Sequence, residues 1–98
     1  MVDVVYTQGE LRDMILPLLE KHGMASARLF GSYARGEADG ASDIDVLLCR
    51  QEGTPLFNVC GLAEDLHRVS GKCVDVYEES ELYASPFRDA VLREAIAL

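Results

Sequence analysis

The run from Ile44 to Leu48 is the clearest β-strand in the sequence, because branched aliphatic residues dominate it. The strand carries a carboxylate at Asp45, and Asp43 comes directly before it. Side chains alternate between the two faces of a strand, so these carboxylates point the same way, roughly 6.5–7 Å apart along the backbone. Ile44, between them, points to the opposite face. The segment therefore predicts a core strand that presents two acidic groups side by side.

Helical and strand-like patterns alternate on both sides of this strand. The expected elements are a helix from the capping box at Thr7 to Gly23, strands at 26–30, 44–48 and 73–77, a helix from Thr54-Pro55 to Ser70-Gly71, and a final helix that begins at Ser85-Pro86 and carries Phe87, Val91, Ala95 and Ile96. The order α-β-(turn)-β-α-β-α predicts an α/β (α+β) fold, in which helices flank a small mixed β-sheet. No linker or repeat interrupts it, so residues 1–98 are expected to form a single domain.

Composition narrows the classes of function. The chain has 98 residues and a net charge of −8, and 49% of its residues are hydrophobic. Such a chain can fold compactly, but its acidity argues against direct stable binding to nucleic acid, which requires a basic face. Its apolar runs are too short to cross a membrane, and the N-terminus lacks a basic signal-peptide region. The odd number of cysteines, each among apolar neighbours, indicates reduced core thiols. A cytoplasmic protein is expected.

A third carboxylate, Asp75, lies between two valines in the strand at 73–77. If this strand lies beside the first one, Asp43, Asp45 and Asp75 converge. Clustered carboxylates repel one another and need a cation, and oxygen-only ligands with open positions suit Mg²⁺. Three of them can hold two ions that clamp the attacking and leaving oxygens of an in-line displacement.

Gly31-Ser32 directly follows the strand at 26–30 and is the candidate phosphate cradle. Glycine lets the backbone approach a bulky anion, and the hydroxyl of Ser32 can donate to a phosphate oxygen. A helical turn that starts at Ser32 adds free N–H groups, and Arg35 adds positive charge one turn later. Each feature alone also fits an ordinary turn or a solvent-facing strand. Their combination indicates transfer chemistry on a nucleoside triphosphate.

The segments Leu29–Ala38 and Ser42–Asp45 resemble the signature of the minimal nucleotidyltransferases, a small branch of the polymerase-β-type nucleotidyltransferase superfamily. Gly71–Val76 is similar to the third-carboxylate strand of that family. The resemblance implies the nucleotidyltransferase fold, ATP as substrate and Mg²⁺ as cofactor.

The resemblance also implies a role for each motif residue. Gly31 and Ser32 would cradle the triphosphate, and Asp43 and Asp45 would bind the metal ions. Asp75 would help to bind metal and to activate the acceptor hydroxyl.

Proteins of this branch commonly act as antitoxins in HEPN/MNT toxin–antitoxin pairs. The resemblance thus implies a HEPN-type ribonuclease toxin as partner, a hetero-oligomer, and transfer of AMP to a hydroxyl of the toxin, with tyrosine the expected acceptor. Two alternatives stay open. The chain could neutralise its partner by binding and occlusion without catalysis, or the acceptor could be a small molecule such as an aminoglycoside.

Overall fold

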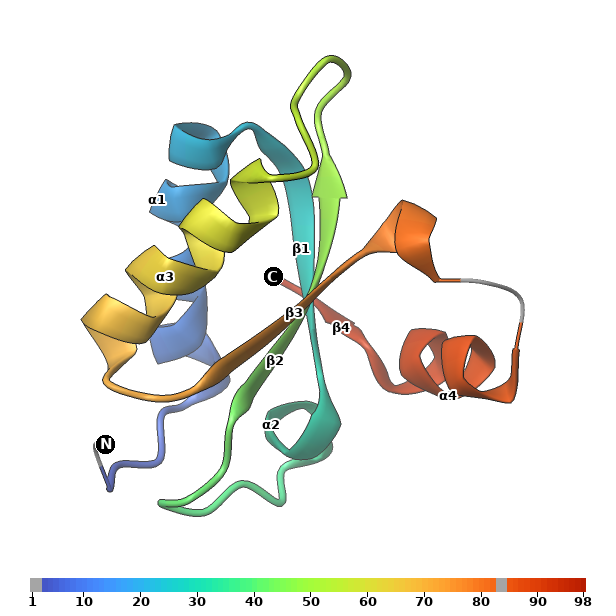
Figure 1. The fold of residues 1–98 in the computed structure, drawn as a ribbon. Helices are drawn as coiled ribbons and strands as arrows, with labels where there is room; N and C mark the ends of the chain where they lie inside the picture. Colours follow the sequence, from blue (N-terminus) through green and yellow to red (C-terminus); the bar gives the residue numbers. More distant parts are fainter. Residues whose placement is uncertain (1–2, 83–84) are drawn as a thin grey trace.

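The structure, a computed structural model, describes residues 3–82 and 85–98. Its elements follow the order α1 (Gln8–His22), β1 (Met24–Phe30), α2 (Gly31–Arg35), β2 (Ile44–Arg50), α3 (Asn58–Ser70), β3 (Val74–Glu78), the 3₁₀ turn η1 (Glu79–Glu81), α4 (Pro86–Glu94) and β4 (Ile96–Ala97). The strands form one four-stranded sheet in the order β3-β2-β1-β4 (Figure 1). The expected mixed sheet flanked by helices is confirmed.

The first helix begins and ends where its capping residues predict. The Thr7 hydroxyl accepts a hydrogen bond from the Glu10 N–H, and the Glu10 carboxylate accepts one from the Thr7 N–H, which completes a capping box. Gly23 ends the helix in the left-handed conformation, with φ of 73°. The helix runs through Pro17 without ending there.

Both antiparallel and parallel pairing occur in the sheet. β1 pairs antiparallel with β2 and with β4, whereas β2 and β3 run parallel and are joined by the crossover helix α3. In the parallel pair Asp45 lies opposite Asp75. This register decides the geometry of the site.

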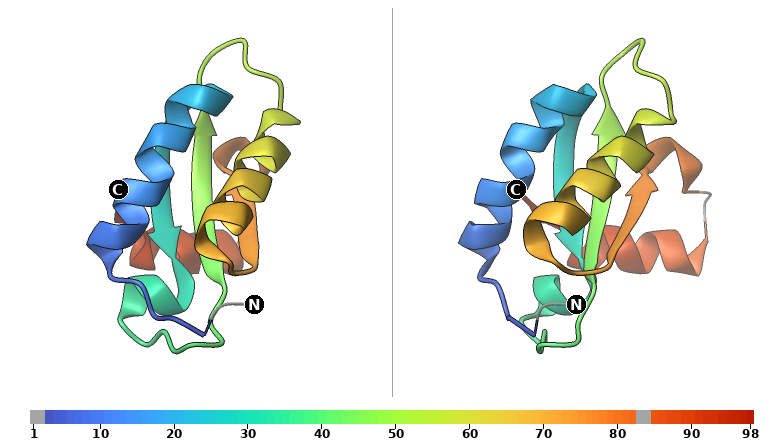
Figure 2. Two further views of the ribbon diagram at one scale, coloured as in Figure 1. Left: turned by 90° about the vertical axis from the view of Figure 1, so that its left-hand side faces the viewer. Right: turned by 60° about the vertical axis from the view of Figure 1, so that its left-hand side comes forward.

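Two unequal cores lie on the two faces of the sheet. Helices α1 and α3 cover one face, and α4 lies on the other (Figure 2). The larger core, under α1 and α3, contains Ile44, Val46 and Leu48 of β2. The smaller one joins Phe30, Leu47 and Val91. Because β2 alternates between the two cores, Asp45 projects on the α4 side of the sheet.

The final helix is shorter than its apolar pattern predicts. Ala95 and Ile96 were expected in it, but α4 ends at Glu94 and Ile96 pairs with Leu29 as part of β4. The main-chain groups at the open edge of β1 can pair with another strand. Pairing with β4 at this edge outweighs the helical preference that the apolar spacing of this segment predicts.

The third helix begins later than expected. Thr54-Pro55 opens a series of tight turns, and α3 itself starts at Asn58. The prediction of core thiols is wrong as well: Cys60 and Cys73 are exposed, and Cys49 is half-buried. Apolar neighbours in sequence do not decide on which side of a helix or strand a residue lies. Within residues 3–82 and 85–98, no helix has the length and apolar character needed to cross a membrane.

Candidate active site

Asp45 and Asp75 form the centre of the site. They lie directly opposite each other on β2 and β3, and their side chains share the face of the sheet turned away from α1 and α3. Burial, the negative charge of Asp75 and a hydrogen bond to its carboxyl group together raise the pKa of Asp45 to about 6. In the absence of a cation, the Asp45 carboxyl group therefore keeps its proton to a higher pH than an ordinary aspartate does.

Asp43 stands beside this pair and is exposed, one residue before β2. Its charge also raises the pKa of Asp45. Across residues 3–82 and 85–98, however, no three acidic, histidine or cysteine side chains gather closely enough to hold one metal ion among them. The structure therefore brings Asp45 and Asp75 together and leaves Asp43 at the rim.

The donor set at this point fits a hard divalent cation. Asp45 and Asp75 offer oxygen ligands only, and burial together with the negative charge of Asp75 makes ionised Asp45 unfavourable, which a cation would relieve. Mg²⁺ characteristically takes one or two protein carboxylates and completes its shell with water and phosphate oxygens. The residues present fit Mg²⁺.

Gly31 joins the carboxylate pair to the predicted phosphate cradle. It begins α2 with φ of 73°, a left-handed conformation that favours glycine. A side-chain carbon at this position would collide with the carboxylate of Asp45. Ser32 follows and is half-buried in the same turn. The predicted cradle therefore lies directly against Asp45, one member of the acidic pair.

Arg35 was predicted as a phosphate ligand, and the structure shows it engaged by two carboxylates. Its Nε lies 3.1 Å from Oε2 of Glu37, and its Nη1 lies 3.1 Å from Oε2 of Glu94. These hydrogen bonds raise the pKa of Arg35. Sequence reasoning missed Glu94, which lies 59 residues from Arg35 in the chain and carries no motif.

The loop between α2 and β2 is tied down by Lys72. This side chain is only 1% exposed, and its Nζ donates to the carbonyl oxygen of Gly40 at 2.9 Å. The tie lies three residues before Asp43. It restricts the path along which the chain delivers that carboxylate to the site.

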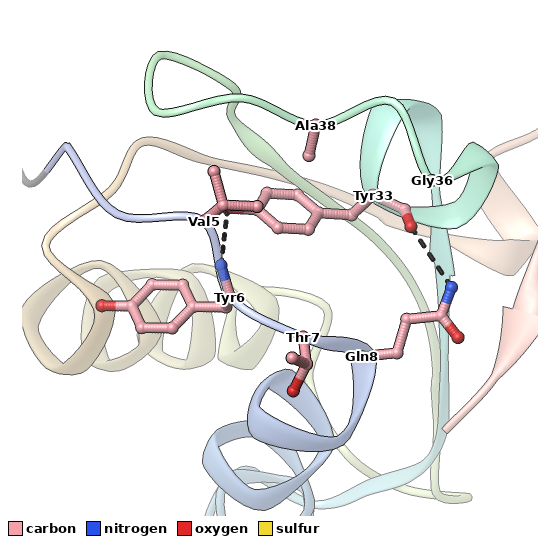
Figure 3. A pocket seen from close by; sticks show the side chains of 7 residues that line it. All are labelled: Val5, Tyr6, Thr7, Gln8, Tyr33, Gly36 and Ala38. Atoms are coloured by element: carbon pink, nitrogen blue, oxygen red, sulfur yellow. Dashed lines mark hydrogen bonds between the residues drawn. The ribbon is translucent and has the colours of Figure 1, made fainter.

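The N-terminal segment holds α2 from another direction (Figure 3). The Tyr6 N–H donates to the Tyr33 hydroxyl, and the Gln8 side-chain amide donates to the Tyr33 carbonyl. A pocket of about 190 Å³ lies between this segment and the turn after α2; it is lined by Val5, Tyr6, Thr7, Gln8, Tyr33, Gly36 and Ala38. None of the predicted site residues lines it, and its contacts hold α2 in place.

An aromatic cluster flanks the site on β3. The ring of Tyr77 lies 5.6 Å from that of Phe30 and 5.9 Å from that of Phe87, centroid to centroid. Tyr77 follows Asp75 by two residues, so both project from the same face of the strand. The cluster gives the site an apolar wall that the sequence pattern does not indicate.

The amino-acid sequence is similar to those of known protein families and proteins. The chain matches the nucleotidyltransferase domain family over residues 11–98. It is 40% identical, over 90% of its length and 94% of the relative's, to a candidate protein adenylyltransferase of Methanocaldococcus jannaschii. It is 38% identical to the protein adenylyltransferase MntA of Thermococcus cleftensis, over 81% of this chain and 79% of that protein.

Solved structures share the architecture. A candidate minimal nucleotidyltransferase superposes with a TM-score of 0.76 at 41% identity, over 90% of this chain and 89% of the other. A second match is one chain in the structure of a complex between a tri-AMPylated HEPN toxin of Shewanella oneidensis and an MNT antitoxin. The TM-score is 0.65, over 88% of this chain and 66% of the matched chain. At 19% identity, that second likeness concerns the fold alone.

Proposed function

The chain belongs to the nucleotidyltransferase domain family, and we propose that it is a Mg²⁺-dependent protein adenylyltransferase that acts on a partner toxin. The reaction moves AMP from ATP to a hydroxyl, with tyrosine the expected acceptor. One observation carries the proposal: Asp45 and Asp75 lie opposite each other, and Asp45 lies against Gly31, the glycine that opens the proposed phosphate cradle.

Each residue has a separate task in this reaction. The turn at Gly31 and Ser32 holds the triphosphate through the Ser32 hydroxyl and the main-chain N–H groups that follow Gly31, whose own N–H donates to Glu94. Asp75, exposed on β3, accepts the proton of the acceptor hydroxyl. The acceptor oxygen then bonds to the α-phosphorus, the bond from that phosphorus to the bridging oxygen breaks, and pyrophosphate leaves.

Asp45 and Asp75 would hold Mg²⁺, with Asp43 supplying a further carboxylate from the rim; a second ion is part of the proposal. When bound, the metal neutralises charge on the phosphates and on the leaving pyrophosphate. Asp45 must be ionised to serve as a ligand. Its raised pKa of about 6 still leaves it ionised at neutral pH.

The proposed partner is a HEPN-type toxin in a hetero-oligomer in the cytoplasm. Support comes from the relatives named as protein adenylyltransferases and from the HEPN–MNT complex that shares this fold. The net charge of −8 favours a protein partner over nucleic acid. The exposed position of Asp75 suits an acceptor carried by another protein.

The deciding experiment is AMP transfer from labelled ATP to the product of the neighbouring gene, the candidate for the proposed toxin. Wild type with Mg²⁺ should label the toxin, and the label should lie on a tyrosine by mass spectrometry. Asp45→Asn should reduce transfer by at least about a hundredfold, because it removes a charged ligand of the proposed Mg²⁺, the ion that would neutralise negative charge on the phosphates. Glu64→Gln, an exposed site on α3, serves as the control and should transfer normally.

Rescue of cells from the toxin separates catalysis from occlusion. If the double variant Asp43→Ala/Asp45→Ala folds and still rescues fully without labelling, the chain neutralises its partner by binding alone. Absence of labelling by the wild type would reject the enzymatic proposal. Labelling of an aminoglycoside in place of the toxin would move the acceptor to a small molecule.

A further inference from the structure

Glu94 makes two contacts with the turn that we propose as the phosphate cradle. Its Oε1 accepts a hydrogen bond from the Gly31 N–H at 2.9 Å. Both of its carboxylate oxygens accept from Nη1 of Arg35, at 3.3 and 3.1 Å. The first residue of α2 and its last residue are thus held by one side chain of α4.

The backbone of Glu94 is itself fixed by the fold. Val91, one turn earlier, is 4% exposed and packs in the smaller core with Phe30 and Leu47. Ala95 and then β4 follow directly, and β4 pairs with Arg28 and Leu29 of β1. Glu94 therefore lies between a buried helical turn and a paired strand, so its backbone is held in place and its half-buried side chain starts from a fixed point.

The other side of the Gly31 turn is closed by Asp45. A side-chain carbon at Gly31 would overlap the Asp45 carboxylate, so the turn lies between an acidic side chain of β2 and one of α4. The Gly31 N–H and Arg35 lower the pKa of Glu94, so its carboxylate stands ionised beside the turn. The contacts therefore hold the first residue of α2, directly before Ser32.

We propose that Glu94 is a positioning residue: it orients the Gly31–Ser32 turn for the triphosphate and holds Arg35 as a structural partner of that turn. This inference rests on the proposed function. It reassigns Arg35 from a phosphate ligand to a brace. It also makes nucleotide binding depend on the position of α4, an element without any motif residue.

The test compares Glu94→Ala, Glu94→Gln and Glu94→Asp with the control Glu64→Ala, which removes a similarly arginine-paired carboxylate from α3. The dissociation constant of a non-hydrolysable ATP analogue with Mg²⁺ is measured by calorimetry. The Gly31 amide is followed by ¹⁵N NMR without nucleotide, and the melting temperature reports folding. The NMR signal tests the brace independently of any activity.

Glu94→Ala should weaken binding by about tenfold, as expected for the loss of a charge-assisted hydrogen bond, and should shift the Gly31 amide upfield. Glu94→Gln keeps an oxygen acceptor, so its binding should stay within about threefold of wild type. Glu94→Asp keeps the charge but withdraws the carboxylate by one methylene, and it should bind as weakly as the alanine variant. Because its charge is native, this variant keeps the test decisive if Glu94→Ala does not fold.

Tighter binding in Glu94→Ala would overturn the inference, since Glu94 would then compete with phosphate. An unchanged dissociation constant together with an unchanged NMR signal of the Gly31 amide would also overturn it. The contacts of Glu94 would then be an ordinary surface ion pair without a role in nucleotide binding. Either result leaves the proposed function intact if the wild type binds MgATP and transfers AMP. A wild type that does neither removes the proposed function and this inference with it.

Discussion

At the scale of single residues, the site depends on the pairing of Asp45 with Asp75 across β2 and β3. The period-two alternation of a strand predicts that Asp43 and Asp45 share a face, and the valines around Asp75 predict that it faces away from the core. Alternation cannot predict the register between strands. Here the register places Asp45 opposite Asp75, and Asp43 lies directly before the first residue of β2. Register depends on pairing between distant segments.

The raised pKa of Asp45 predicts how stability without ligand depends on pH. Its surroundings are Asp75, Asp43 and, opposing them, Arg35. The folded state binds the Asp45 proton more tightly than the unfolded state, so this group favours folding below pH 3.8, and that contribution is lost as pH rises through about 6. Above that pH the ionised carboxylate destabilises the fold by about 1 kcal/mol, after allowance for solvent screening.

Asp45→Asn should therefore be more stable than wild type at pH 7 and similar to it near pH 4, when both are unfolded by urea with a chelator present. Asp13→Asn, on the exposed side of α1, is the control and should show no such pH-dependent gain. A gain for Asp45→Asn that is equal at both pH values would contradict the placement of Asp45 beside Asp75.

At the scale of elements, local patterns predict the interior of each helix and strand better than its ends. The capping box at Thr7 and the glycines after α1 and α3 define boundaries through their own side chains or conformations. β4 has no such signal, because it exists only where β1 offers an open edge. Glu94 could not be predicted as part of the site for the same reason.

Substitution of Lys72 should lower the rate of AMP transfer without lowering the stability of the fold. Lys72→Met keeps the apolar stem and removes a buried ammonium group, so the melting temperature should stay equal or rise. The loop should lose its tie at Gly40 and deliver Asp43 less accurately, which should lower AMP transfer by about tenfold.

Parallel melting and transfer assays check this prediction, with Lys21→Met at an exposed position as the matched control. Transfer at the wild-type rate by Lys72→Met would mean that the loop needs no tie.

At the scale of the whole molecule, the two faces of the sheet have different tasks. The larger core under α1 and α3 holds the fold, whereas the α4 side carries Asp45, Asp75 and the aromatic wall. The alternation of helices and strands along the sequence predicts this layered arrangement. The division of tasks between the faces could be predicted only in part, because the place of α4 depends on β4.

MgATP should stabilise the folded chain by mass action, because the proposed site exists only in the folded state. MgATP at 100 times its dissociation constant should add about 2.7 kcal/mol to the free energy of unfolding of the wild type. Asp45→Asn should show little of this gain despite its higher stability without ligand. Thermal melts with Mg²⁺ alone, ATP alone and both together measure the effect. An undiminished response of the variant would place the nucleotide elsewhere.

One of the two edge strands of the sheet, β3, carries exposed Asp75, the proposed proton acceptor. A reactive group at a lateral margin can be approached from the side by an object much larger than the enzyme, whereas a group at the bottom of a cavity selects its substrate by size. Discrimination among acceptors would then reside in the fit between two protein surfaces. Substitutions on the surface around the acidic pair could then change the target protein during evolution, while the acidic pair itself stays unchanged.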